Sequence, residues 1–321
     1  MSQDYIYAVT RVRARETGLL TKGDLERLMA CQTEEECLRV LRDKGWGRED
    51  RSSAGEMLAA EEEKTWEFLK ELTQDLSPFA PLVLPTDGNN LKAAVKCAVL
   101  EASPQGVFLP GGQWAPEALL SMARERDFSP LPPALAQAAE RACRALLQTG
   151  DGQLCDVLID RACLEELLRL GRESSLPVLK RYGELTVAGA DIRMAARACR
   201  AGKNREFLQL ALAPCPGLDT DALAGAALQG MEALLAYVAS TPYSRGVPAL
   251  QESLAAFEKW CDDQALELLQ GEKMEYETAG PLFAYAVARR RETDTVRILL
   301  SGKRNGLPEG RIRERLRETY V

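Results

Sequence analysis

The segment Ala279–Val321, AGPLFAYAVARRRETDTVRILLSGKRNGLPEGRIRERLRETYV, contains the pattern that decides the fold. Pro281 suits the first turn of a helix, where no backbone N–H is needed. An apolar stripe at helical spacing follows it, so we predict one long helix that ends at Gly302. The stripe consists of Ala286, Val287, Val296, Leu299 and Leu300.

A second, terminal helix is predicted after the turn at residues 302–308. Pro308 is able to start it, and apolar side chains then recur at every fourth position. They are Ile312, Leu316 and Tyr320. The C-terminal segment is therefore predicted to consist of two consecutive helices.

The composition extends this helical pattern to the whole chain. Of 321 residues, 46% are hydrophobic, 28% are charged and only 6% are aromatic, and Ala and Leu are abundant. A chain of this kind folds into helices more readily than into a β-sandwich. We therefore predict an all-α fold.

Helix starts are marked by pairs of residues with the spacing of a capping box. They are Thr21–Asp24, Thr33–Glu36 and Ser53–Glu56. The acidic run 61–63 is predicted to lie on the solvated face of the helix that Ser53 opens. Pro78, Pro81 and Pro85 predict an extended passage, with the next helix starting at Asp87, a typical N-cap residue.

A weak internal repeat links distant parts of the chain. The stretch after Gly189 repeats the stretch after Gly88 with a displacement of 101 residues, and a fainter third copy lies at 295–300. Each copy combines a small polar, an aliphatic and a basic residue. Three copies at nearly equal spacing predict three homologous helical units. The aligned residues of the first two are Asn90, Leu91 and Lys92 with Asp191, Ile192 and Arg193.

Several classes of chemistry have no support in the sequence. The chain contains no histidine, which excludes Ser–His and Cys–His nucleophiles, and its nine cysteines include no C-x-x-C pair. There is no P-loop, G-x-G-x-x-G or G-x-S-x-G motif. A net charge of −7 argues against nucleic acid as a partner. We predict no enzymatic activity, cofactor, metal, small-molecule substrate or transmembrane span.

Asp156 and Asp160 lie one helical turn apart and could in principle act as acid and base. Nothing else in the sequence forms a reacting site around them. We interpret them as capping and surface charges, and a histidine-free hydrolase that uses them is the weakest alternative.

The C-terminal segment resembles the C subunit of prokaryotic A/V-type rotary ATPases, the family that includes the d (AC39) subunit of the vacuolar ATPase. In that family, a glutamate and an arginine precede a GK-x-NGL-P turn and an I-R-x-R-L helix, which correspond here to Glu292, Arg297, 302–308 and 312–316. The family's D-x-x-N-L-K motif corresponds to Asp87, Asn90, Leu91 and Lys92, and its Y-x-Y-A-x-x-R-x-R opening to 5–13.

The resemblance implies three similar helical lobes with pseudo-threefold symmetry that form a funnel-shaped socket. We place them at 1–110, 111–215 and 216–321. It further implies a non-catalytic central-stalk subunit that couples the shaft subunits D and F to the membrane ring of c (K) subunits. Such a subunit lies on the cytoplasmic face of the membrane, held there by the ATPase complex.

Two sets of residues follow as candidates. The basic residues near the C-terminus exceed the local acidic ones and could dock a partner, although they could equally form local ion pairs or brace the lobes. These candidates are Arg289, Arg290, Arg291, Lys303, Arg304, Arg311, Arg313, Arg315 and Arg317. The motif residues that we expect at helix openings are Asp87, Asn90, Leu91, Lys92, Asp191, Arg193, Glu292 and Arg297.

The alternative from another class is a helical adaptor or scaffold unrelated to rotary ATPases, which would share the acidic, helix-rich character.

Overall fold

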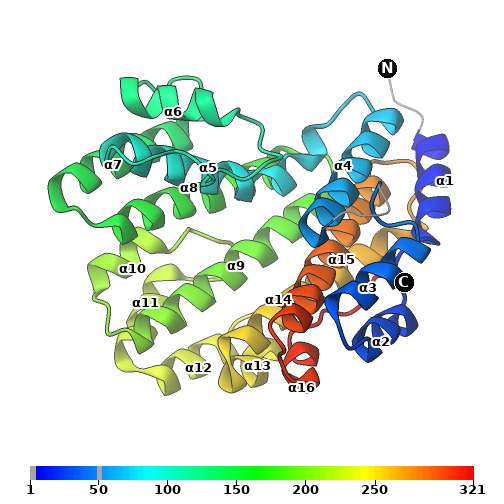
Figure 1. Ribbon diagram of the computed structural model, residues 1–321. Coiled ribbons are helices and arrows are strands. Elements are labelled where there is room, and N and C mark those ends of the chain that lie inside the picture. Colours follow the sequence, from blue (N-terminus) through cyan, green and yellow to red (C-terminus); the bar gives the residue numbers. More distant parts are fainter. Residues whose placement is uncertain (1–4, 49–52) are drawn as a thin grey trace. The chain divides into compact units, whose positions relative to one another are not determined.

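The computed structural model describes residues 5–48 and 53–321, and these form helices joined by turns and loops (Figure 1). No β-strand occurs in the described part, which confirms the prediction of an all-α fold. The chain divides into two compact units: one combines 1–79 with 255–321, and the other is 80–254.

The first unit brings the two ends of the chain together. Its long helix α15 packs against α1, α3 and α4. Side chains from both ends share one hydrophobic core, in which Leu28, Met57 and Leu299 are fully buried. The elements are α1 (Tyr5–Glu16), α2 (Lys22–Ala30), α3 (Glu34–Asp43), α4 (Ala54–Leu72), η1 (Ser77–Phe79), α14 (Leu254–Gln270), η3 (Gly271–Met274), α15 (Gly280–Arg304) and α16 (Glu309–Arg313).

The helix starts of this unit follow the sequence prediction. Thr21 with Asp24, and Ser53 with Glu56, form complete capping boxes at the starts of α2 and α4. The Thr33 side chain accepts a hydrogen bond from the Glu36 N–H at the start of α3. Local hydrogen bonding between residues three apart is sufficient to fix these helix starts.

The predicted end of the long helix is wrong, because α15 continues through Gly302 to Arg304. Gly302 instead permits a close approach of the chain that follows. A Cβ atom at this position would lie 2.6 Å from Ile312 Cγ1, so only glycine leaves room for this side chain.

The terminal helix is also shorter than predicted, since α16 ends at Arg313 and residues beyond 315 are not helical. The extended tail carries Tyr320 to η3, where Lys273 donates a hydrogen bond of 3.0 Å to the Tyr320 carbonyl. The Lys273 ammonium also lies 4.7 Å from the Tyr320 ring centroid. A continuous helix would not let the chain reach this contact.

The second unit is built around α5, α8 and α9. Helix α8 packs against α5, α7, α9 and α10, and α9 packs against α11. Gly88 allows α5 to approach the Cys163 side chain of α8 closely, because a Cβ there would lie 2.6 Å from Cys163 Sγ. The elements are α5 (Ala80–Val99), α6 (Pro116–Glu125), α7 (Pro133–Thr149), α8 (Gly152–Glu173), α9 (Pro177–Arg200), α10 (Arg205–Ala211), α11 (Thr220–Gln229), α12 (Met231–Ala239), η2 (Ser244–Gly246) and α13 (Val247–Glu252).

The predicted extended passage before Asp87 is wrong. A short 3₁₀ helix at Ser77–Phe79 leads directly into α5, which contains Pro85. Pro81 occupies the first turn, where it is tolerated, whereas Pro85 removes one backbone hydrogen bond. Burial of Leu82 and Leu84 on the same turns offsets that loss.

Candidate functional site

A buried cluster of charges joins three segments of the first unit. Arg289, on α15, forms ion pairs with Glu61 of α4 and with Glu292 one turn along its own helix. Glu292 also accepts a hydrogen bond from the backbone N–H of Leu20, in the linker between α1 and α2. The guanidinium of Arg289 lies 5.3 Å from the centroid of the Trp46 ring.

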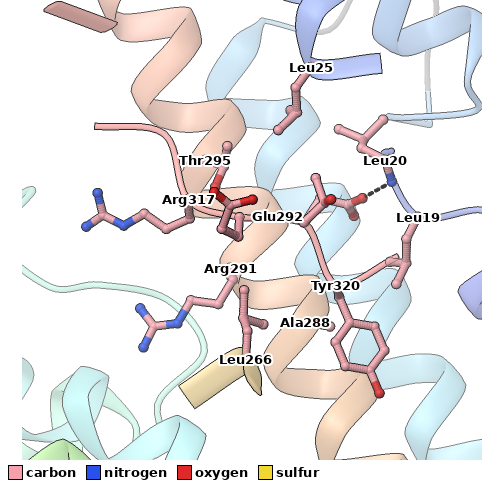
Figure 2. Close-up of a pocket in the computed structure, with 12 residues that line it drawn as sticks. Leu19, Leu20, Leu25, Leu266, Ala288, Arg291, Glu292, Thr295, Arg317 and Tyr320 are labelled. Carbon is pink, nitrogen blue, oxygen red and sulfur yellow. Dashed lines mark hydrogen bonds between the residues drawn. The ribbon is translucent and has the colours of Figure 1, made fainter. Parts of the chain in front are cut away.

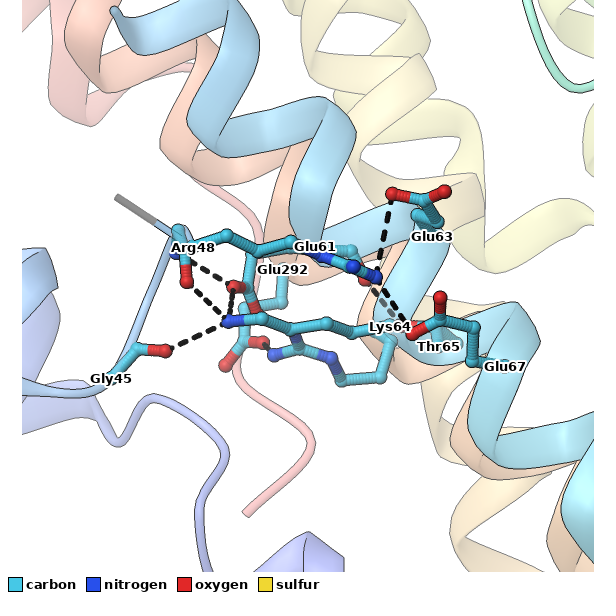
Figure 3. A network of polar contacts seen from close by, with 10 residues as sticks. Gly45, Arg48, Glu61, Glu63, Lys64, Thr65, Glu67 and Glu292 are labelled. Carbon is cyan, nitrogen blue, oxygen red and sulfur yellow. Dashed lines mark hydrogen bonds and ion pairs between the residues drawn. The ribbon is translucent and has the colours of Figure 1, made fainter. Parts of the chain in front are cut away.

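Lys64 extends the cluster to the linker between α3 and α4 (Figure 3). Its Nζ atom lies 2.7 Å from Glu61 Oε1 and donates to the carbonyls of Gly45 and Gly47 at 3.0 and 2.6 Å. Glu61 Oε1 in turn accepts the Gly47 N–H at 2.9 Å. Two carboxylates therefore face two cations and several backbone dipoles, which compensates their burial.

The protonation state of Glu292 depends on the balance between its burial and these contacts. Burial raises the pKa of Glu292, while the Arg289 guanidinium and the Leu20 N–H favour the ionised form. The geometry points to a structural role, because the polar atoms of the cluster bind one another and the backbone.

A pocket lies beside the cluster, lined by α15, the α1–α2 linker and the C-terminal tail (Figure 2). Its arginines are bound within the chain: Arg291 lies 2.7 Å from Asp262 Oδ1, and Arg317 lies 2.8 Å from Asp262 Oδ2. Figure 2 shows Glu292 turned toward the Leu20 backbone nitrogen. A single carboxylate of α14, that of Asp262, therefore fastens both α15 and the tail at the edge of the pocket.

Three further docking candidates hold the C-terminal segment to α2 and α3. Lys303 donates to the carbonyl of Met29 at 2.6 Å. Arg304 binds Glu34 through Nε at 2.7 Å. Arg313 binds Glu26 at 2.9 Å and Glu309 at 2.8 Å. Only the Arg313–Glu309 pair is local, and the other contacts reach residues that are distant in the sequence. Partner binding by the same residues stays a prediction.

The remaining docking candidates lie on the surface. The Arg311 side chain is 68% exposed and is 3.5 Å from Glu314. Arg315 is exposed and forms no ion pair with the described residues. Arg290 is also exposed, on α15. Arg311 and Arg315 thus present positive charge outward from the end of the chain.

The motif residues of the first copy do not open a helix, because Asp87 and Asn90 lie inside α5. Asp87 Oδ1 accepts the Gln113 N–H at 2.7 Å, and burial raises its pKa to about 6. Asn90 accepts the Leu109 N–H at 2.8 Å and donates to the Leu109 carbonyl at 2.9 Å. Both side chains therefore hold the linker between α5 and α6. Leu91 is buried beside them.

The basic residue of the first copy, Lys92, binds Asp160 of α8 at 2.6 Å, and Lys96 binds Asp156 at 2.6 Å. The two aspartates therefore belong to separate ion pairs between α5 and α8. Their interpretation as surface charges agrees with side-chain exposures of 38% and 48%, whereas a capping role is wrong, because both lie inside α8 and Asp151 caps its start.

In the second and third copies, too, a buried side chain inside a helix binds a linker, which we call the helix-to-linker device. Asp191, inside α9, accepts the Ala213 N–H at 3.1 Å, and Arg193 donates to the Gly189 carbonyl at 3.3 Å. In the third copy, Arg297 aligns with Lys92 and pairs with Asp294. Glu292, five residues before Arg297, then aligns with Asp87 and lies inside α15. In every copy a buried carboxyl or amide binds the backbone N–H of a linker outside its own helix.

The sequence patterns did not single out Glu61 and Lys64. The prediction that Glu61 lies on a solvated face is wrong, since this residue is 4% exposed. Its spacing after Met57 and before Phe68 places it on the buried stripe of α4, which is the signal that could have revealed it.

The fold and these sites together define an all-α protein in which one helix-to-linker device occurs three times. The sequence pattern of the family described as "ATP synthase (C/AC39) subunit" matches residues 8–315. The C subunit of the V-type sodium ATPase of Enterococcus hirae is 21% identical over 321 residues, which cover 96% of this chain and 97% of that protein. The chain belongs to the ATP synthase (C/AC39) subunit family.

Membership of this family makes the chain a subunit of a V/A-type ATPase, with other subunits of that complex as partners. None of the helices in the described residues is both long enough and apolar enough to span a membrane.

Proposed function

We propose that this protein is a non-catalytic rotor subunit of the central stalk, which couples the D/F shaft to the membrane ring of c (K) subunits. The observation that carries the proposal is the family match over almost the whole chain, together with a relative that aligns over 96% of this chain and 97% of its own length. In this role the protein transmits torque, and it lies on the cytoplasmic face of the membrane as part of the complex.

Torque transmission requires a body that does not deform between its two partners. The first unit supports this role, because the Glu61–Arg289–Glu292 cluster joins the first and last parts of the chain through buried contacts. Lys303 and Arg304 add further contacts between α15 and the helices α2 and α3. Crosslinks between sequence-distant helices stiffen a fold more than contacts within one helix.

The proposed assembly has three helical lobes at 1–110, 111–215 and 216–321. The three copies of the helix-to-linker device support this division, since one copy falls in each interval. The funnel-shaped socket belongs to the same proposal.

Docking to an acidic partner surface is assigned to Arg311 and Arg315. Their side chains are exposed, and Arg311 has only a surface contact of 3.5 Å with Glu314. Arg304, Arg313 and Arg317 are bound more closely to acidic residues of the same chain. Exposed positive charge on an acidic protein mainly steers association and fixes orientation.

The test is co-expression with the D and F subunits of the same ATPase, followed by affinity purification on a tagged D subunit and gel filtration. The proposal expects a stable three-chain complex. Recovery of D and F without this chain, both with and without the c ring, contradicts the proposal. Capture of this chain by proteins outside the ATPase instead would favour a helical adaptor.

A further inference from the structure

The linker between α5 and α6 (residues 100–115; Figure 1) exposes apolar side chains on the second unit. Leu100, Val107 and Leu109 are 57%, 44% and 47% exposed. The same stretch carries no charge: residues 102–116 contain no Asp, Glu, Lys or Arg, although these make up 28% of the chain. Exposed apolar side chains without charged neighbours are typical of the centre of a protein–protein interface.

This α5–α6 linker is held in a fixed conformation. Asn90 accepts the Leu109 N–H at 2.8 Å and donates to the Leu109 carbonyl at 2.9 Å. Gly106 and Gly111, which both have positive φ, turn the chain on either side of residues 107–110. The exposed apolar segment is therefore ordered before any partner arrives, and a preordered surface loses little conformational entropy on binding.

The other two copies of the helix-to-linker device show how the apolar side chains of such a linker are covered. The N–H that the buried side chain binds belongs to Ala213 in the second copy and to Leu20 in the third, and these residues are 0% and 3% exposed. Their neighbours Leu212 and Leu19 are also buried. Leu109 has the same place in the first copy but is 47% exposed. Of the three linkers, this one has apolar side chains that the described chain leaves uncovered.

The charges beside the α5–α6 linker indicate the chemistry of its partner. Glu101 and Glu117 flank the uncharged run, and both are exposed. A complementary partner has an apolar centre, because an unpaired charge buried there would be costly, and basic side chains at its rim. Anionic lipid headgroups would be repelled by the two glutamates. A symmetric contact with a second copy would bring the two acidic rims together, which disfavours a dimer through this surface.

We propose that residues 100–109 dock on another subunit of the ATPase, at a surface with an apolar centre and a basic rim. Family membership supplies the class of partner, because it makes the chain a subunit of a V/A-type ATPase. The linker belongs to the second unit, whereas Arg311 and Arg315 belong to the first. This docking surface is therefore additional to theirs, and it rests on family membership rather than on the central-stalk role.

The direct test is site-specific photocrosslinking in the purified, intact ATPase. A benzophenone amino acid replaces Val107 or Leu109 in turn, and the adducts are identified by mass spectrometry after irradiation. Both positions should crosslink to the same neighbouring subunit. Leu228 of α11, which is 43% exposed in the same unit, is the matched control. The proposal is overturned by adducts with lipid or with a second copy of this chain, and by a yield no greater than that of the control.

A second experiment measures how strongly the α5–α6 linker contributes to binding. Val107→Asp/Leu109→Asp places two charges in the apolar centre. It should weaken binding of the chain to the ATPase assembled without it by about tenfold or more. Asn90 binds only the backbone of Leu109, so the unfolding curve should not change. Leu228→Asp is the control, and equal affinities of the double variant and the control would contradict the docking surface.

Salt dependence distinguishes this surface from the basic docking residues. Apolar contacts keep their strength at high salt, so the loss of affinity in Val107→Asp/Leu109→Asp should persist there. The loss expected for Arg311→Glu/Arg315→Glu should shrink instead. If the D and F subunits fail to bind the chain while the linker still crosslinks to another ATPase subunit, the proposed function fails and the linker docking stands.

Discussion

Arg289 and Glu61, separated by 228 residues in the sequence, form a buried ion pair that joins α15 to α4. Glu292 completes this pair and binds the linker between α1 and α2. The fold of the first unit therefore depends on a charge cluster whose members come from opposite ends of the chain.

Replacing Arg289 with Met should lower the free energy of unfolding by about 3–5 kcal/mol. The substitution leaves buried Glu292 without a cation and Glu61 with Lys64 alone, which is the costly way to break a buried pair. Chemical denaturation of the full chain measures this loss. Arg297→Met, which breaks an exposed pair on the same helix, should change stability by about 0.5 kcal/mol or less. Equal losses in the two variants contradict a structural role for the cluster.

Replacing Gly302 with Ala should destabilise the protein by about 1–3 kcal/mol, because the new Cβ overlaps Ile312. The double variant Gly302→Ala/Ile312→Ala tests the cause, since it removes the clash and should lose less than the sum of the single changes. Gly310→Ala is the control, as a Cβ at that position meets nothing within 4 Å. Additive losses would show that the two residues do not interact.

Asp87 should make the stability of the second unit depend on pH. Its pKa is raised by burial from 3.8 to about 6, so stability falls as pH rises through this range. Between pH 4 and pH 7, the free energy of unfolding of Asp87→Asn should therefore change less than that of the wild type. The difference between the two changes should be about 2–3 kcal/mol at most. Thermal unfolding at both pH values gives the comparison. Parallel curves for the two proteins would mean that Asp87 ionises normally.

The double variant Arg311→Glu/Arg315→Glu should weaken association with the stalk partners by about tenfold at low salt and leave the unfolding curve unchanged. Charges at the rim of an interface act through long-range attraction, so the difference should shrink at high salt. Arg124→Glu, an exposed change on α6, serves as control. If the double variant binds the stalk partners as tightly as the control at every salt concentration, Arg311 and Arg315 are not part of the docking surface.

The sequence predicted the local features of the fold well. The capping pairs at Thr21 and Ser53 act within three residues, and the composition sufficed for the all-α class. The interior position of Asp87 and Asn90 could not be predicted, because a short polar side chain binds the N–H groups of its own helix start and of a distant linker equally well. The bond from Leu20 to Glu292 spans 272 residues and depends on tertiary packing alone.

The candidate site was predicted in part. The repeat at Asn90 and Asp191 was visible in the sequence, but its function of holding linkers needed coordinates. Glu61 was misread because three consecutive glutamates suggest a solvated face, whereas the helical period buries the first of them.

The most direct test of the proposed role is coupling in the assembled ATPase. The complex is reconstituted into vesicles with and without this chain, and ATP hydrolysis and ATP-driven ion transport are measured on the same preparations. A rotor coupling role predicts that hydrolysis continues without the chain while ion transport is lost, and that adding the chain restores transport. Ion transport at the full rate in its absence would contradict this role.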